Sequence, residues 1–210
     1  KVISLEHAPI DIANRITTAT NTQNRVEAKD FLALDPRQDG IAESMKKLGI
    51  QYCYRRGERV ADPTRGLEVQ ELAMALAISS DNMASVTIAK RNAGSLTDPN
   101  AYYQKLFDKP IEGSKGWELV RKWRAASAAV SSYAATLEGR DAQLAVHGNR
   151  FIEHLLLTTE GDFTPERIAK IHTALRGLVD EIHGSDCYLA VLFKNTKKCE
   201  VLQARIFPIV

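Results

Sequence analysis

Several features that mark particular protein classes are scarce in this chain of 210 residues. Its three cysteines, Cys53, Cys187 and Cys199, form no CxxC pair, so the sequence predicts reduced structural thiols rather than a zinc site. No apolar run approaches the roughly 18 residues that cross a bilayer, since runs such as Leu72 to Ile78 and Tyr188 to Phe193 are far shorter. We therefore expect a soluble, cytoplasmic protein that does not enter a membrane.

The chain also has little net charge of either sign. Lys and Arg number 28 and Asp and Glu number 26, for a net charge of +2, so any contact with nucleic acid has to be local. Gly113 and Gly116 do not form a phosphate-binding loop, because Gly116 is not followed by Lys and Ser/Thr, and we predict neither a cofactor nor a metal site. The first residues show no signal-peptide pattern, and the start at Lys1 without methionine predicts a piece of a longer protein.

What the sequence does contain is enough apolar residues, 44%, for one large or two small cores. A strand at 2–5 and a helix at 11–20 are expected first. Asp35-Pro36 then predicts a helix start, with an N-cap carboxylate and proline at the first position, and Gly49 predicts its end. The alternation over 50–56 predicts a half-buried strand in an edge hairpin that turns at 56–59.

Beyond Pro63 the periodicity is helical. Helices are expected at 67–78, 81–90, 100–107, 117–137, 141–157 and 165–182. Two further helices, rather than a hairpin, are favoured within 186–206, and the proline and glycines of 108–116 predict a boundary. The predicted fold is mainly α, with a small mixed α/β N-terminal portion at 1–110 followed by a helical bundle at 115–210.

Polar side chains after the helix at 11–20 are the first candidate for binding. The carboxamides of Asn21, Gln23 and Asn24 offer donors and acceptors to phosphates, sugars and base edges. The same residue types also commonly cap the end of a helix, and by type alone that interpretation is the more frequent one.

A basic patch on the strand at 50–56 is the second candidate. Arg55 and Arg56, with Arg59 and Arg65 nearby, stand beside Tyr52 and Tyr54, an arrangement that suits binding phosphate and stacking on bases. Charged residues also protect exposed strand edges from pairing, so a solvated edge is the alternative.

The order and spacing of these residues resemble the abortive-infection phage resistance (AIPR) family. The resemblance runs over roughly residues 1–107 and rests on NTQNRV at 21–26, Asp30, the Asp-Pro-x-Gln segment that ends at Gln38, and YRRGE at 54–58. Other members carry an upstream nuclease-like domain and an Asn-Gly-x-Gln-Thr box. The resemblance therefore implies the non-nuclease part of a defence protein, which binds DNA, RNA or a nucleotide without a catalytic centre of its own. The binding residues that it implies are Asn21, Gln23, Asn24, Arg25, Asp30, Gln38, Tyr54, Arg55 and Arg56.

The order of strand, helix and Asn-x-Gln-Asn box is also similar to the second half of ParB-like domains. In those domains a related box lies beside a nucleotide or DNA phosphate. This likeness implies that Asn21, Gln23 and Asn24 line one side of a polar pocket, with Arg25 near the phosphate.

Two other functions stay open. Arg140-Asp141 with His147 fits the Arg-x4-6-His motif of metal-independent HEPN-like ribonucleases, as do pairs at 167/172 and 176/183, although roughly one match is expected by chance. His147 and His154, seven apart on one face of the predicted helix, lack a third metal ligand. The small residues of 125–135 suggest instead a helix that packs subunits into a homo-oligomer.

Overall fold

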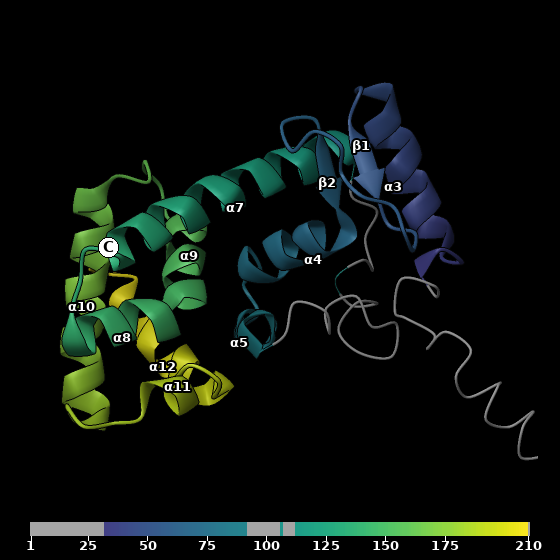
Figure 1. Ribbon diagram of the computed structural model, residues 1–210. Helices are drawn as coiled ribbons and strands as arrows, with labels where there is room; N and C mark the ends of the chain where they lie inside the picture. Colours follow the sequence, from purple (N-terminus) through teal and green to yellow (C-terminus); the bar gives the residue numbers. More distant parts are fainter. Residues whose placement is uncertain (1–31, 92–105, 107–111, 210) are drawn as a thin grey trace, which may run out of the picture.

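The computed structural model describes residues 32–91, 106 and 112–209, and its elements are mainly helical, as predicted (Figure 1). The strand expected at 2–5, the helix at 11–20 and most of the helix at 100–107 lie outside these residues. In chain order the elements are α3 (Pro36–Lys47), β1 (Gln51–Cys53), β2 (Gly66–Glu68), α4 (Val69–Ile78), α5 (Met83–Arg91), α7 (Gly113–Ala134), α8 (Gly139–His147), α9 (Asn149–Thr158), α10 (Pro165–His183), α11 (Leu189–Leu192) and α12 (Thr196–Ile206).

Local signals fix both ends of α3. The Asp35 carboxylate accepts the Arg37 N–H at 3.0 Å, and Pro36 occupies the first helical position. After the C-cap, Gly49 adopts a φ of 72°, and Ile50 N–H returns to the carbonyl of Met45 at 3.0 Å. The predicted start and glycine end of this helix are confirmed.

β1 does not form the expected edge hairpin. It pairs in parallel with β2, so that Gln51 lies opposite Gly66, and the residues between the strands return along the sheet. The Gln51 side chain holds this connection, because it donates to the Arg59 carbonyl at 3.0 Å and accepts the Ala61 N–H at 2.9 Å. A Cβ at Gly66 would lie 2.7 Å from Val60 Cγ1, so the close approach of the connection requires glycine.

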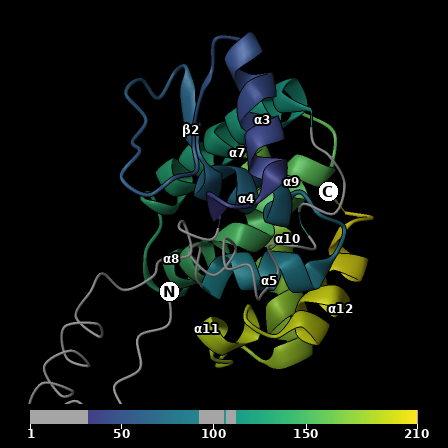
Figure 2. The same cartoon turned by 90° about the vertical axis from the view of Figure 1, so that its right-hand side faces the viewer.

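Two hydrophobic clusters are joined by α7. The first gathers residues of α3, the sheet and α4, such as Met45, Leu67 and Leu72, and the second gathers residues of α8 to α12. Val120 of α7 belongs to the first cluster and Val130 to the second, and α3 and the α11–α12 pair lie at opposite ends of the structure (Figures 1 and 2). A division of the chain at 110–115 stays a prediction.

The helix predicted at 141–157 is in fact two helices, α8 and α9, with the break at Gly148. The break has little room for a side chain, because a Cβ at Gly148 would lie 2.7 Å from the Leu144 carbonyl oxygen and 3.1 Å from Phe193 Cζ. The final segment is helical, as expected, and Asn195 caps α12 by accepting the Lys198 N–H at 3.1 Å. None of the described helices combines the length and apolar character that crossing a membrane requires.

Candidate functional site

Helix α3 and strand β1 bring together several residues that carry the family resemblance. Tyr52 of β1 and Tyr54, directly after the strand, stack with ring centroids 5.6 Å apart at 16°. The Tyr52 hydroxyl donates to the Gln38 amide oxygen, and the Tyr54 hydroxyl donates to the Asp39 carboxylate. Both rings and the Gln38 side chain are buried, so these bonds hold α3 against β1.

Tyr54 supports a guanidinium above it. The Arg55 Cζ atom lies 5.0 Å from the centroid of the Tyr54 ring, and Arg55 Nη2 lies 3.5 Å from Asp39 Oδ1. Burial, followed by the hydrogen bond to the Asp39 carboxylate, raises the pKa of the Tyr54 phenol. The phenol therefore stays protonated as a donor, and the guanidinium lies on the solvent side of its ring.

A tight turn then exposes two arginines, and we call residues 54–58 the arginine turn. The Glu58 carboxylate accepts the backbone N–H groups of Tyr54 at 3.0 Å and Arg55 at 2.9 Å, and Gly57 adopts a φ of 81°. With the backbone held from within, the side chains of Arg55 and Arg56 are exposed.

The predicted site residues thus fall into three groups. Asn21, Gln23, Asn24, Arg25 and Asp30 lie outside the described residues. Arg55 and Arg56 are exposed on one turn, whereas Tyr54 is buried beneath Arg55 and Gln38 is buried against Tyr52. A tyrosine stacked on a base, as the sequence suggested, would first need the buried Tyr54 ring to be uncovered.

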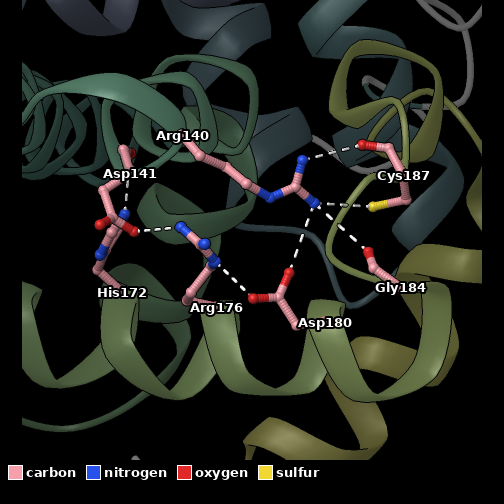
Figure 3. A network of polar contacts seen from close by, with 7 residues as sticks. All are labelled: Arg140, Asp141, His172, Arg176, Asp180, Gly184 and Cys187. Carbon is pink, nitrogen blue, oxygen red and sulfur yellow. Dashed lines mark hydrogen bonds and ion pairs between the residues drawn. The ribbon is translucent and has the colours of Figure 1, made fainter.

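Several arginines and histidines of the ribonuclease alternative take part in a polar network between α8 and α10 (Figure 3). Arg176 Nη1 lies 2.6 Å from Asp141 Oδ1, and Arg176 Nε donates to Asp180 Oδ2 at 2.6 Å. Asp180 also pairs with Arg140 Nη2 at 3.4 Å, and His172 Nε2 donates to the Asp141 carbonyl at 3.1 Å. The two arginines and two carboxylates balance in charge and fasten α8 to α10.

The contacts of Arg140 also have a structural explanation. Besides Asp180, it donates to the carbonyl oxygens of Cys187 at 3.3 Å and Gly184 at 3.4 Å, which anchors the loop after α10 (Figure 3). His147 ends α8 seven positions further on, about 10 Å along the axis at 1.5 Å per residue. This geometry gives the ribonuclease hypothesis no support, and it stays an untested alternative.

The two histidines considered for a metal lie on different helices, α8 and α9. His154 is fully buried, with Nδ1 2.7 Å from the Ile78 carbonyl oxygen and Nε2 2.8 Å from Gln203 Nε2. Because a carbonyl accepts and an amide nitrogen donates, His154 is the Nδ1–H tautomer, with both nitrogens in use. Among the described residues, no three His, Cys, Asp or Glu side chains gather as metal ligands.

The small-residue stretch at 125–135 lies in α7 and is divided between interior and surface. Ala126 and Val130 pack into the second hydrophobic cluster, whereas Ala125 and Ala128 are exposed. Part of the stretch thus packs into the core of the chain, and a homo-oligomer through the exposed part stays a prediction.

One face of α7 was not predicted as a site. Trp117 and Arg121 on this helix and Arg65 before β2 line a cavity of about 340 Å³. The four-residue spacing in the WELVR segment places Trp117 and Arg121 on one helical face, which the sequence alone could have indicated. The approach of Arg65 depends on the parallel sheet, which no pattern in the sequence signals.

Comparison with known proteins identifies a matching family but no matching individual protein. Residues 1–135 match the family described as "AIPR protein", which is well over half of the 210 residues. No curated protein and no solved structure matches the chain. The matched range includes α3, the arginine turn and the first helices of the core, while the likeness to ParB-like domains stays a prediction. The chain therefore belongs to the AIPR family, whose name links it to abortive-infection defence against phage.

Proposed function

We propose that this chain is the non-nuclease part of an anti-phage defence protein and that its arginine turn binds nucleic acid or a nucleotide. The observation that carries the proposal is the pair of exposed arginines, Arg55 and Arg56, on a backbone fixed by the Glu58 carboxylate. A rigid backbone lowers the entropy lost when a guanidinium is ordered on a phosphate.

The contacts of Arg55 suit exchange with a phosphate. Its bond to Asp39 is long, at 3.5 Å, and the two side chains are 56% and 55% exposed. An exposed pair of this kind contributes about 0–1 kcal/mol, so breaking it costs little. A phosphate also accepts two parallel hydrogen bonds from the planar guanidinium, so it can take the place of the weakly held Asp39 carboxylate.

The proposal extends to residues outside the described part of the chain. The family resemblance implies that Asn21, Gln23, Asn24 and Arg25, with Asp30, contribute to the same binding function. It also implies an upstream nuclease-like domain as the partner that performs catalysis. On this proposal the chain supplies recognition.

The test uses the complete protein, with phage protection and nucleic-acid binding as separate measurements. Arg55→Ala/Arg56→Ala, and separately Asn24→Ala, should reduce both plaque suppression and the affinity for single-stranded DNA or RNA. The matched control is Lys194→Ala/Arg205→Ala, which removes the same charge from exposed residues of the C-terminal helical region. Unchanged protection and unchanged binding in both test variants would overturn the proposal.

A further inference from the structure

The cavity beside α7 carries an inference that does not rest on the arginine turn. It lies where α3 ends, β2 begins and α7 starts, and it is lined by Arg65, Ser114, Trp117, Glu118 and Arg121 among others. Since the flanking residues Leu48 to Ile50 precede β1 and the arginine turn follows it, the two surfaces are at opposite ends of that strand.

Close backbone contacts fix the walls of this cavity. A Cβ at Gly113 would lie 2.9 Å from the backbone nitrogen of Met45, so the start of α7 lies directly against α3. Gly49, with its φ of 72°, leads from α3 into β1, and a Cβ there would lie 3.6 Å from Arg65 Nη2. The shape of the cavity therefore depends on packed elements rather than on one loop.

Two guanidinium groups at this cavity have donors to spare. Within residues 32–91, 106 and 112–209, the side chains of Arg65 and Arg121 make no hydrogen bond or ion pair. Arg124, one turn further along α7, shows the contrast, because Glu71 and two carbonyl oxygens occupy its donors. The lining also includes the Glu118 carboxylate, so these three charged residues sum to +1.

An aromatic wall stands next to the charges. Trp117 is half-buried and lines the same cavity, one helical turn before Arg121. Arg124 lies 5.6 Å from the Trp117 ring centroid, which helps to hold the indole in place. A fixed indole beside these two arginines combines a surface for a planar ring with donors for an anion.

We propose that this cavity binds a nucleoside phosphate. The phosphate lies between Arg65 and Arg121, the base lies against Trp117, and the Glu118 carboxylate accepts a hydrogen bond from a ligand hydroxyl or amino group. A volume of about 340 Å³ is within the range of small-molecule pockets. A second hollow of about 400 Å³ adjoins this cavity along α7 and is lined by Lys122 and Phe163 among others, so there is room for a longer ligand.

The experiment titrates the full chain with ADP, CDP, GDP and UDP by isothermal calorimetry, and with inorganic phosphate and adenosine as separate arms. At least one nucleoside diphosphate should bind ten-fold or more tightly than phosphate or adenosine. Arg121→Ala should weaken that binding at least ten-fold while leaving the thermal unfolding midpoint unchanged, and Trp117→Phe should weaken it less.

Two variants separate binding in this cavity from binding at the arginine turn and from a purely stabilising role of Arg65. Arg55→Ala/Arg56→Ala should leave diphosphate binding unchanged, so failure here and failure of the arginine turn are distinguishable. Arg65 also lies near the end of α3, where a cation stabilises a helix. The proposal is overturned if no diphosphate binds the parent chain and Arg65→Ala only lowers stability. It is also overturned if Arg121→Ala binds the diphosphate with the same affinity as the parent chain. Equal affinity for phosphate and diphosphate would overturn it too.

Discussion

Arg124 on α7 joins three parts of the first hydrophobic cluster, and its replacement by alanine tests how that cluster is held together. Its guanidinium makes a forked ion pair with Glu71 of α4, with Nη2 2.7 Å from Oε2 and Nε 2.9 Å from Oε1. It also donates to the carbonyl oxygens of Pro63 at 2.7 Å and Gly66 at 3.0 Å. Glu71 in turn accepts the Glu68 N–H at 2.9 Å and so caps α4.

The size of the effect follows from these contacts. The side chains of Arg124 and Glu71 are 27% and 29% exposed, so solvent screens the pair only in part. Hydrogen bonds to charged groups contribute about 1.5–3 kcal/mol each, but several on one guanidinium do not add. We expect Arg124→Ala to lower the free energy of unfolding by about 3 kcal/mol, and the unfolding midpoint by about 6–12 °C at this chain length.

Urea unfolding followed by circular dichroism measures this change. Arg124→Lys should lose more than half of the same stability, because an ammonium cannot make the forked contact. The control is Arg121→Ala on the same helix, whose side chain is exposed and which should change stability by less than about 0.5 kcal/mol. If Arg124→Ala costs no more than Arg121→Ala, the assignment of Arg124 as a cross-link between elements is wrong.

Three further changes test the second cluster. Burial lowers the pKa of His154 from its ordinary value of 6.5. In urea melts, the free energy of unfolding should therefore keep its full value above pH 6.5 and fall below it by up to about 1.4 kcal/mol per pH unit. His154→Gln should remove this share of the pH dependence. Gly148→Ala should cost about 1–3 kcal/mol, since its Cβ would meet the Phe193 ring and the Leu144 carbonyl. Gly177→Ala, on the exposed face of α10 with open space around it, should instead raise the free energy of unfolding by about 0.5–1 kcal/mol. A loss of stability in Gly177→Ala, or no loss in Gly148→Ala, would contradict the packing described.

The elements that the sequence predicted well are those with local causes. Asp35-Pro36 and Thr164-Pro165 start helices because the cap and the fixed proline φ act within one turn. The helical C-terminal segment was also predicted correctly, and Asn195, between α11 and α12, caps α12. Such signals need no knowledge of the partner elements.

The features that the sequence did not predict depend on contacts between residues far apart in the chain. The α8–α9 break falls at Gly148, where the ring of Phe193, far along the chain, leaves no room for a side chain, and an isolated glycine within a helical pattern gives little warning of a break. β2 is three residues long and pairs in parallel across a connection without a helix, so its sequence reads as the start of α4. Short parallel pairing leaves no periodic signal.

The candidate sites divide in the same way. The exposure of Arg55 and Arg56 follows from a local turn sequence with Gly57 and Glu58, which the basic patch already indicated. The burial of the Tyr54 ring could not be predicted, because it depends on α3. The cavity at Arg121 depends on three elements and has no signal within any one of them.

The central claim is that the arginine turn binds the phosphates of a nucleic acid, and the salt dependence of binding tests it most directly. The measurement is fluorescence anisotropy of a labelled single-stranded oligonucleotide, titrated with the chain and with Arg55→Ala/Arg56→Ala over a series of salt concentrations. If each arginine contacts one phosphate, the slope of log affinity against log salt should be smaller by about 1.4 in the double variant. An identical slope and affinity in parent and variant would contradict the claim.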